Sequence, residues 1–418
     1  MPADPRTFAI VGASLAGAKA AETLREEGYD GRLVLLGAEH ERPYERPPLS
    51  KDYLRGESER AGAYVHEAAF YSEQEIELRT GAAVTGLDVS TRELELEGGE
   101  RLGYDRLLLA TGAEPRRLNV PGADLEGVHL LRTFRDSDAL RDRLDAGGRL
   151  VVVGAGWIGS EVAASARQRG LEVTVVAPEA VPLERVLGPE VGAIYRDLHR
   201  DNGVEMRMED GVAAFEGAGR VERVRTQDGA VIDCDAVVVG VGATPRTQLA
   251  AAAGLAVENG VLVDGRLETS APGIFAAGDI ANQLHPLLGR LRVEHWDNAL
   301  HQGPAAARSM LGTAESYARA PYFFSDQYDV GMEYSGHATS WDRVVFRGDP
   351  ASREFIAFWL AEGRVLAGMN VNVWDVAEPI QALIAGGHAV DERRLSDPDV
   401  PLTELIAGDQ AAPGKVAS

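Results

Sequence analysis

Two short glycine loops in this sequence have the spacing that binds a dinucleotide. One of them, GAGWIG, follows the apolar run LVVV and places Gly154, Gly156 and Gly159 in the pattern G-x-G-x-x-G. The first glycine of this pattern makes a tight turn, the second lets the backbone approach a pyrophosphate, and the third allows close packing of helix on strand. The phosphates bind the free N–H groups at the start of the following helix. The loop therefore predicts a dinucleotide site.

The other loop, GASLAG, follows the apolar run FAIV near the N-terminus and contains Gly12, Ser14 and Gly17. Ser14 replaces the middle glycine, but serine is small and its hydroxyl can face a phosphate. A lone loop can be a purely structural turn. Here each loop is followed downstream by a similar segment, YDRLLLATGAEPR (104–116) and CDAVVVGVGATPR (234–246). The sequence therefore predicts two copies of a nucleotide-binding domain, and we assign Gly242 to the second site.

An acidic residue about 20 residues after such a loop should bind the adenosine ribose. In the first copy, RLVLLGAEHE offers Glu39. In the second, VTVVAPEA has Ala177 at the expected position and offers Glu179 two residues later. Either acid could also be a solvated loop residue. Neither strand end carries an arginine suited to a 2′-phosphate, which favours NADH over NADPH.

The order of these segments predicts a nested arrangement of domains. We expect a first dinucleotide-binding domain in two parts, residues 1–113 and 246–318, with the second such domain inserted at 114–245. TSAPGIFAAGDIAN (269–282) reads as a strand, a turn and a helix that return the chain to the first domain. Residues 319–418 read as an antiparallel sheet followed by a helix around VAEPIQALIAGG.

Composition excludes several other classes of protein. A formal net charge of −23 over 418 residues disfavours nucleic-acid binding and a polybasic membrane anchor. We find no run of about 18 apolar residues and no signal-peptide pattern, so we expect a cytoplasmic protein away from membranes. Cys234 is the single cysteine. It can form neither an internal disulfide, nor a CxxC pair, nor an iron–sulfur site, and we predict no metal site.

From RPYERPPLSKDYL (42–54) onward the chain resembles the FAD-dependent NADH:ferredoxin reductases of bacterial oxygenase and P450 systems. The resemblance runs through GAGWIGSE, ERVLG, GVGATPR, TSAPGIFAAGD, VEHWDNA and YFFSDQYD. It implies an α/β fold like that of glutathione reductase, with an FAD domain, an inserted NADH domain and a C-terminal α+β interface domain. FAD would then bind the N-terminal loop, and NAD(H) the loop at Gly154.

The same resemblance implies roles for individual residues. It implies flavin contacts at the following positions: Ala16, Lys51, Val84, Arg132, Asp279 and Trp296. It also implies that Glu161 pairs with Lys51 beside the flavin N5, and we assign this pair as catalytic. Asp279 could equally cap a helix starting at Ile280. This chain departs from some relatives at Ala38, which leaves Glu39 for the ribose, and at Phe324, where several relatives have a tryptophan.

The resemblance implies an enzyme that takes hydride from NADH and passes single electrons to a [2Fe–2S] ferredoxin, or to a rubredoxin. That carrier would serve a P450 or a ring-hydroxylating oxygenase. One alternative is a peroxide reductase or NADH oxidase of the same fold, which needs a cysteine near the flavin, whereas Cys234 is expected to be buried and inert. Another is a flavin- and NADH-sensing protein like the apoptosis-inducing factors. A ferredoxin would dock on a local basic patch, for which the candidates are Arg290, Arg292, Arg308 and Arg319.

Overall fold

The structure is a computed structural model that describes residues 6–406, and these residues form two compact units. The first unit contains the described part of Met1–Leu49 together with Gly56–Arg116 and Ala243–Arg319. The second unit contains Ser50–Arg55, Arg117–Gly242 and the described residues from Ala320 onward. The short segment Ser50–Arg55 thus groups with the inserted and C-terminal regions, whereas we had expected it in the first domain.

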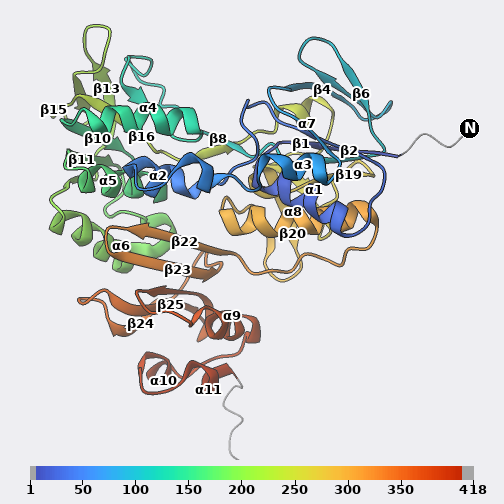
Figure 1. Ribbon diagram of the computed structural model, residues 1–418. Helices are drawn as coiled ribbons and strands as arrows, with labels where there is room; N and C mark the ends of the chain where they lie inside the picture. The colour runs from blue at the N-terminus through green and yellow to red at the C-terminus, as the bar shows by residue number, and fades with distance from the viewer. Residues whose placement is uncertain (1–5, 407–418) are drawn as a thin grey trace, which may run out of the picture. The chain divides into compact units, whose positions relative to one another are not determined.

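The first unit is built on a parallel sheet of five strands in the order β19-β7-β1-β2-β3 (Figure 1). The strands are apolar runs buried on both faces, as parallel strands usually are. Helix α1 follows the first glycine loop and packs against the long helix α8. The bounds are β1 (Thr7–Val11), α1 (Leu15–Glu26), β2 (Arg32–Leu36), β3 (Ile76–Arg79), β7 (Arg106–Leu109), β19 (Ile274–Ala276) and α8 (Trp296–Leu311).

Smaller elements complete the first unit. They include two three-stranded sheets and short helices. The bounds are η1 (Pro47–Ser50, which ends in the second unit), η2 (Arg60–Ala63), α3 (Ala68–Glu73), β4 (Val84–Asp88), β5 (Glu93–Leu96), β6 (Arg101–Gly103), α7 (Gln248–Ala252), β18 (Val261–Val263), η3 (Gly278–Ile280), β20 (Ala281–His285) and β21 (Gly289–Leu291).

The second unit repeats the same parallel topology, with strands in the order β12-β11-β10-β16-β9. Its central strand β10 pairs with β11 and β16 in the way that β1 pairs with β2 and β7. This repeat confirms the sequence prediction of two related nucleotide-binding folds. The bounds are α2 (Asp52–Arg55), β9 (Val128–His129), α4 (Phe134–Asp145), β10 (Arg149–Val153), α5 (Trp157–Gln168), β11 (Glu172–Ala177), α6 (Glu184–Asp201), β12 (Glu205–Met208), β13 (Val212–Glu216), β14 (Arg223–Thr226), β15 (Val231–Asp233) and β16 (Ala236–Val239).

The chain segments that leave and re-enter the first unit pair with each other. Strand β8 (Ala113–Pro115) runs antiparallel to β17 (Ala243–Pro245), which are the ends of the two similar segments noted in the sequence. Strand β19 then returns to the parallel sheet beside β7, as expected. The prediction of a helix starting at Ile280 is wrong, because a single 3-10 turn at Gly278–Ile280 leads directly into strand β20.

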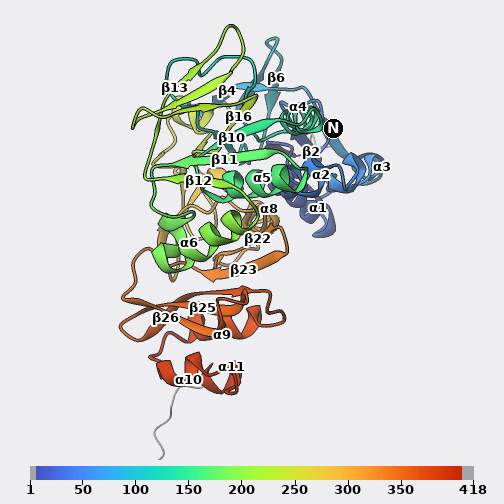
Figure 2. The same cartoon turned by 90° about the vertical axis from the view of Figure 1, so that its left-hand side faces the viewer.

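The C-terminal part of the second unit is an antiparallel sheet in the order β22-β23-β26-β25-β24. Helix α6 covers one face of this sheet and α9 covers the other (Figure 2). A kink divides α6 at Gly188 and Pro189, where the backbone φ of Gly188 is +79°. The bounds are β22 (Tyr322–Gln327), β23 (Val330–Gly336), β24 (Arg343–Asp349), β25 (Glu354–Ala361), β26 (Arg364–Val371), α9 (Ala377–Gly386), α10 (Glu392–Ser396) and α11 (Leu402–Ile406).

No helix within residues 6–406 is long and apolar enough to cross a membrane.

Candidate functional site

The glycine loop of the first unit has the shape that a pyrophosphate needs. Gly12 has a backbone φ of +120°, and a Cβ there would lie 2.1 Å from the carbonyl oxygen of Ala110. A Cβ on Gly17 would lie 2.0 Å from the carbonyl oxygen of Gly12, so only glycine allows α1 to pack this closely. Ser14 is the N-cap residue of α1, yet its side chain makes no capping hydrogen bond. These residues fit the pyrophosphate of a dinucleotide, with the Ser14 hydroxyl beside the helix N-terminus.

Glu39 follows β2 and is held by two neighbours. The Tyr44 hydroxyl donates to Oε2 of Glu39 at 2.5 Å, and Nη2 of Arg46 lies 3.1 Å from Oε1. The Glu39 side chain keeps 35% of its surface exposed. A carboxylate held in this way still has oxygen lone pairs for ribose hydroxyls. The spacing after the first glycine loop predicted Glu39 for the ribose, but no local pattern indicated Tyr44 and Arg46, which lie in the RPYERPP segment.

The other flavin-contact candidates of the first unit lie on separate elements. Ala16 is in the first turn of α1, where a Cβ on Gly303 of α8 would come within 2.3 Å of its carbonyl oxygen. Val84 begins β4, and Trp296 begins α8. Asp279 lies in the 3-10 turn, where its carbonyl oxygen accepts a hydrogen bond from Arg292. Asp279 therefore does not cap an α-helix, and its contact with the ribityl chain stays a prediction.

The glycine loop of the second unit has the same close contacts. A Cβ on Gly159 would lie 2.0 Å from the carbonyl oxygen of Gly154, and one on Gly154 would lie 2.5 Å from that of Gly240. By contrast, within residues 6–406 no atom from outside the immediate chain neighbours lies within 4 Å of the position that a Cβ on Gly156 would take. The middle glycine therefore faces open space at the start of α5, which is the space a pyrophosphate requires. Gly242 is exposed, with a φ of +101°.

Glu179 follows β11, as expected, but it has an arginine partner. Nη2 of Arg185 lies 2.7 Å from Oε1 of Glu179, and 79% of the Arg185 side chain is exposed. The expectation that no arginine stands near this acid is therefore wrong. Arg185 belongs to the first turn of α6, and the fold brings it back to the end of β11. The strand ends alone gave no signal for it.

Lys51 and Glu161 form a buried ion pair within the second unit. The Nζ atom of Lys51 lies 2.8 Å from Oε2 of Glu161, and the two side chains are 10% and 5% exposed. The Ser50 hydroxyl donates to the same oxygen at 2.5 Å, and the Ser325 hydroxyl donates to Oε1 at 2.7 Å. A buried charge is stable only when it is paired and hydrogen-bonded, and both conditions hold here.

Segment 50–55 is held against α5, which positions Lys51. The Ser165 hydroxyl of α5 donates to the carbonyl oxygen of Ser50 at 2.7 Å. Helix α2 lies beside α5 (Figure 1). The Lys51 Nζ is also 5.8 Å from the ring centre of Phe324. Arg132, the remaining flavin candidate, precedes α4 in the same unit, and its backbone N–H donates to Asp136.

Comparison with known proteins places this chain in a family. Residues 6–303 match the family described as pyridine nucleotide-disulphide oxidoreductase, and residues 322–406 match the family described as reductase C-terminal. The chain belongs to the pyridine nucleotide-disulphide oxidoreductase family. Membership in this family implies FAD and NAD(H) as cofactors.

Relatives in the family match over nearly the whole chain. The ferredoxin–NAD(+) reductase component of the anthranilate 1,2-dioxygenase system of Burkholderia cepacia is 41% identical, covering 97% of this chain and 100% of the relative. Putidaredoxin reductase CamA of Pseudomonas putida is 38% identical, and the match covers 96% of this chain and 97% of that relative. The crystal structure of a covalent putidaredoxin reductase–putidaredoxin complex matches with a TM-score of 0.93 and 37% identity, covering 97% of this chain and 99% of the matched chain.

The family name includes disulphide chemistry, which this member cannot perform within one chain. Cys234 is its single cysteine, and it is buried between β15 and β16. Burial raises the pKa of its thiol to about 12. The thiol therefore stays protonated at neutral pH and is a poor nucleophile.

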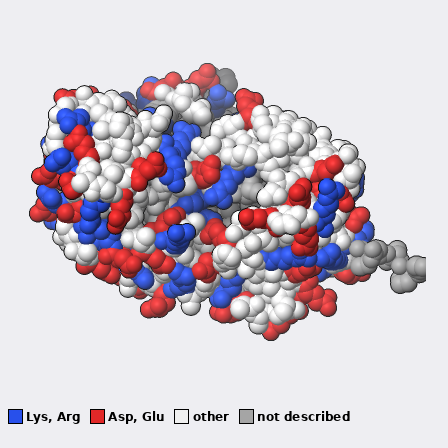
Figure 3. Space-filling view, turned by 90° about the horizontal axis from the view of Figure 1, so that it is seen from above, with Lys and Arg blue, Asp and Glu red and all other residues white. Residues whose placement is uncertain are grey.

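The four arginines expected to form a basic patch are not free cations. Each binds acceptors within the first unit, and three of the four pair with a carboxylate, whereas Arg290 binds neutral backbone carbonyl oxygens. On the face shown in Figure 3, acidic and basic side chains are interspersed. The contacts are Arg292 with Glu294, Arg308 with Glu27, Arg319 with Asp297, and Arg290 with the carbonyl oxygens of Val263 and Asn282. The assignment of this group as the docking patch therefore stays a prediction.

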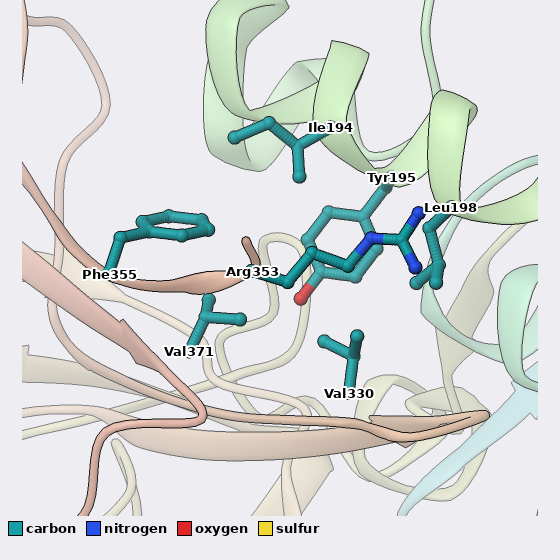
Figure 4. A pocket seen from close by; sticks show the side chains of 7 residues that line it. All are labelled: Ile194, Tyr195, Leu198, Val330, Arg353, Phe355 and Val371. Atoms are coloured by element: carbon teal, nitrogen blue, oxygen red, sulfur yellow. The ribbon is translucent and has the colours of Figure 1, made fainter. Parts of the chain in front are cut away.

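A small cavity lies between α6 and the C-terminal sheet of this family member, apart from every residue assigned to the cofactors (Figure 4). Its volume of about 10 Å³ holds roughly one water molecule. The buried hydroxyl of Tyr195 lies in it, and burial raises the pKa of this hydroxyl. The lining side chains are Ile194, Tyr195, Leu198, Val330, Arg353, Phe355 and Val371. A cavity of this size takes no nucleotide.

Proposed function

We propose that this protein is an FAD-dependent reductase that takes hydride from NADH and passes single electrons to a [2Fe–2S] ferredoxin. The ferredoxin serves a P450 or a ring-hydroxylating oxygenase. The observation that carries the proposal is a full-length match, at 41% identity, to a ferredoxin–NAD(+) reductase component. Two glycine loops of dinucleotide type support it, and so does the inert state of Cys234. The proposal includes a cytoplasmic location.

The cofactors divide between the domains expected from the sequence. FAD binds the domain formed by residues 1–113 and 246–318, NADH binds the domain at 114–245, and residues 319–418 form the interface domain. The residues assigned to FAD are Gly12, Ser14, Ala16, Gly17, Glu39, Lys51, Val84, Asp279 and Trp296 of the FAD domain, together with Arg132, which lies in the range 114–245. The residues assigned to NADH are Gly154, Gly156, Gly159, Glu179 and Gly242, and we now add Arg185 because it pairs with Glu179.

The Lys51–Glu161 pair prepares the hydride transfer. Bound FAD supplies the chemistry, since it accepts two electrons as hydride and can release them singly. Lys51 presents a fixed ammonium group, whose Nζ lies 2.8 Å from Oε2 of Glu161. Glu161 in turn has both carboxylate oxygens engaged, which keeps the pair from rotating. Ammonium groups held in this way stabilise negative charge that develops beside them.

A comparison of electron acceptors tests the proposed function. The purified holoenzyme is supplied with NADH and, in parallel, with a [2Fe–2S] ferredoxin plus cytochrome c, with hydrogen peroxide, and with glutathione disulfide. We expect the ferredoxin to support the fastest turnover, and Cys234→Ser to leave that rate unchanged because the thiol takes no part. Faster turnover with peroxide or disulfide would contradict the proposal. Slow turnover with every acceptor, together with a long-lived reduced flavin–NAD complex, would favour a sensing protein instead.

A further inference from the structure

A line of buried polar side chains extends from Oε1 of Glu161, the carboxylate oxygen that does not pair with Lys51. Ser325, on β22, donates to Oε1 of Glu161 at 2.7 Å. The amide nitrogen of Gln327, on the same strand, lies 3.4 Å from the Ser325 hydroxyl oxygen. The amide oxygen of Gln327 lies 3.0 Å from Nε2 of His199, on α6. Ser325 and Gln327 are 1% exposed and His199 is 0% exposed.

The hydrogen bonds in this line have one consistent direction. The ionised Glu161 carboxylate only accepts, so the single hydroxyl hydrogen of Ser325 must point to it. Ser325 can then only accept from Gln327, which fixes the amide nitrogen of Gln327 on the Ser325 side. The amide oxygen of Gln327 therefore accepts from Nε2–H of His199. Every donor points towards Glu161, and hydrogen bonds aligned in this way polarise one another.

His199 and its further neighbour Tyr328 have the protonation states that this direction of hydrogen bonding requires. Burial lowers the pKa of His199 to about 4, partly offset by the hydrogen bond to Gln327, so the imidazole is neutral at pH 7. With its proton on Nε2, the ring accepts at Nδ1, where the Tyr328 hydroxyl lies 3.1 Å away. Burial raises the pKa of Tyr328, so its hydroxyl keeps the proton it donates.

Tyr328 reaches His199 from a strained position. It lies in the turn between β22 and β23, with a backbone φ of +58°. A residue other than glycine, asparagine or aspartate is seldom found in this left-handed region, because its Cβ approaches the following carbonyl oxygen. The turn thus holds a tyrosine where glycine or asparagine would be less strained, and from this position its hydroxyl contacts His199.

We propose that Ser325, Gln327, His199 and Tyr328 form a positioning chain that orients the carboxylate of Glu161 for the reaction. The inference rests on the proposed function, because it assigns these residues to the role of the Lys51–Glu161 pair in hydride transfer. Ser325 secures Oε1, while Ser50 and Lys51 secure Oε2. The chain does not carry protons, because the amide of Gln327 does not relay them under ordinary conditions. It acts by geometry and by polarisation.

A double-mutant cycle on the holoenzyme tests the positioning chain. Ser325→Ala and Gln327→Leu are each made in the wild type and in Glu161→Gln, and the single-turnover rate of flavin reduction by NADH is measured. Ser325→Ala removes one hydrogen bond to a charged group, so we expect a rate about fivefold to tenfold lower. Gln327→Leu acts through Ser325 and should slow the rate by roughly twofold. Neither change should slow Glu161→Gln further, because the charge on which the chain acts is gone.

The midpoint potential of the bound FAD gives a readout independent of turnover. Ser325→Ala leaves the Glu161 charge less compensated, which disfavours the anionic reduced flavin, so the potential should fall. Ser325→Thr keeps a hydroxyl and should restore both the rate and the potential. The matched control is Ser335→Ala. Ser335 is a buried serine on the adjacent strand β23 that accepts from Gln381 at 3.2 Å and does not touch Glu161. We expect it to leave both readouts unchanged.

The outcomes separate the two levels of the proposal. If Glu161→Gln slows flavin reduction while Ser325→Ala matches Ser335→Ala in rate and potential, the positioning chain is overturned and the role of Glu161 stands. If Ser325→Ala slows the reaction equally with and without the Glu161 charge, Ser325 only supports the fold, which also overturns the chain. If Glu161→Gln leaves the rate unchanged, the hydride-transfer role of the pair fails, and the chain fails with it.

Discussion

The two glycine loops share one backbone design but differ in what surrounds them. In both, a Cβ on the third glycine would lie 2.0 Å from the carbonyl oxygen of the first, at Gly17 and at Gly159. The middle position is Ser14 in the first unit and the unobstructed Gly156 in the second. The backbone contacts therefore specify a dinucleotide site in general, and the loops alone do not show which nucleotide each one binds.

The residues two positions beyond the third glycine of each loop also differ between the two units. In the first unit this residue is Lys19, partly exposed and paired with Glu22 on the same helix. In the second unit it is Glu161, buried and paired with Lys51 from a distant segment. An i,i+3 ion pair near the surface contributes little, whereas a buried and fully hydrogen-bonded pair is costly to maintain and is commonly functional. Chemistry is therefore expected beside the second loop only.

The largest effects should come from filling the two tight contacts. Gly17→Ala and Gly159→Ala place a Cβ on a carbonyl oxygen, and relief of the clash moves each helix away from its strand. We expect Gly17→Ala to lose FAD and to lower the melting temperature. Gly159→Ala should retain FAD and raise the Kd for NADH about 100-fold, which is about 2.7 kcal/mol. Flavin content and NADH titration measure these effects.

Gly62→Ala is the control for that pair, since no atom lies within 4 Å of a Cβ at Gly62. It should retain FAD and the wild-type NADH affinity. Loss of FAD from Gly159→Ala would break the assignment of one nucleotide to each loop.

Glu161→Gln and Lys19→Ala test the contrast between the two charged positions. We expect Glu161→Gln to slow flavin reduction by about tenfold to a hundredfold with FAD still bound, because it removes the charge that holds Lys51. Lys19→Ala should stay within about twofold of the wild-type rate, since exposed helix pairs contribute only about 0.3–0.5 kcal/mol. Stopped-flow absorbance measures both rates. Equal slowing by both changes would show that the second helix has no special role.

The two ribose acids differ in their partners, and nicotinamide selectivity tests this difference. Wild-type enzyme should prefer NADH over NADPH by about tenfold or more in kcat/KM, because Glu179 repels a 2′-phosphate. Glu179→Ala leaves Arg185 without its carboxylate partner, so the preference should fall by about tenfold. Adding Arg185→Ala to Glu179→Ala should return kcat/KM for NADPH to a low value, because the guanidinium expected to bind the 2′-phosphate is then gone.

Glu39→Ala is the counterpart in the first unit. It should weaken FAD retention, because Arg46 and Tyr44 lose the carboxylate that they hold. It should leave the ratio of NADH to NADPH efficiency unchanged. A change in that ratio would mean that the two acids do not serve separate nucleotides.

The smallest effects are expected from exchanging the middle residues of the loops. Gly156→Ser adds a side chain where no atom lies within 4 Å, so the protein should fold normally. The KM for NADH should change by only about twofold to threefold, because a serine fits at the same position in the first loop. Ser14→Gly should keep FAD bound. Steady-state kinetics and flavin content measure both variants, and a large loss in either would show that the middle residue determines nucleotide binding.

Local patterns predicted the parts of this molecule that lie close together in the chain. The glycine loops, the acids Glu39 and Glu179, and the paired segments at β8 and β17 follow from turn geometry and strand periodicity. The prediction of a helix starting at Ile280 was wrong because it, too, rested on the local sequence alone. The segment GDIAN can start a helix, but β20 instead pairs with β18 in the folded protein.

Contacts between distant segments could not be predicted from the residues alone. Ser325 and Glu161 are 164 positions apart, and His199 and Gln327 are 128 apart. A serine, a glutamine and a histidine on different elements carry no spacing signal. Arg185 was missed because the kinked helix α6 begins beside β11, which only the fold shows. The pair of Lys51 and Glu161 was expected through resemblance to a family, since no local pattern joins these two residues.

The stoichiometry of electron transfer tests the central claim most directly. The purified holoenzyme is reduced anaerobically with one equivalent of NADH and mixed with excess oxidised [2Fe–2S] ferredoxin, while flavin and ferredoxin absorbance are followed together. The account predicts two ferredoxins reduced for each NADH oxidised, with the flavin returning to its oxidised form. A reduced flavin that persists in the presence of ferredoxin, but is oxidised readily by peroxide or a disulfide, would contradict it.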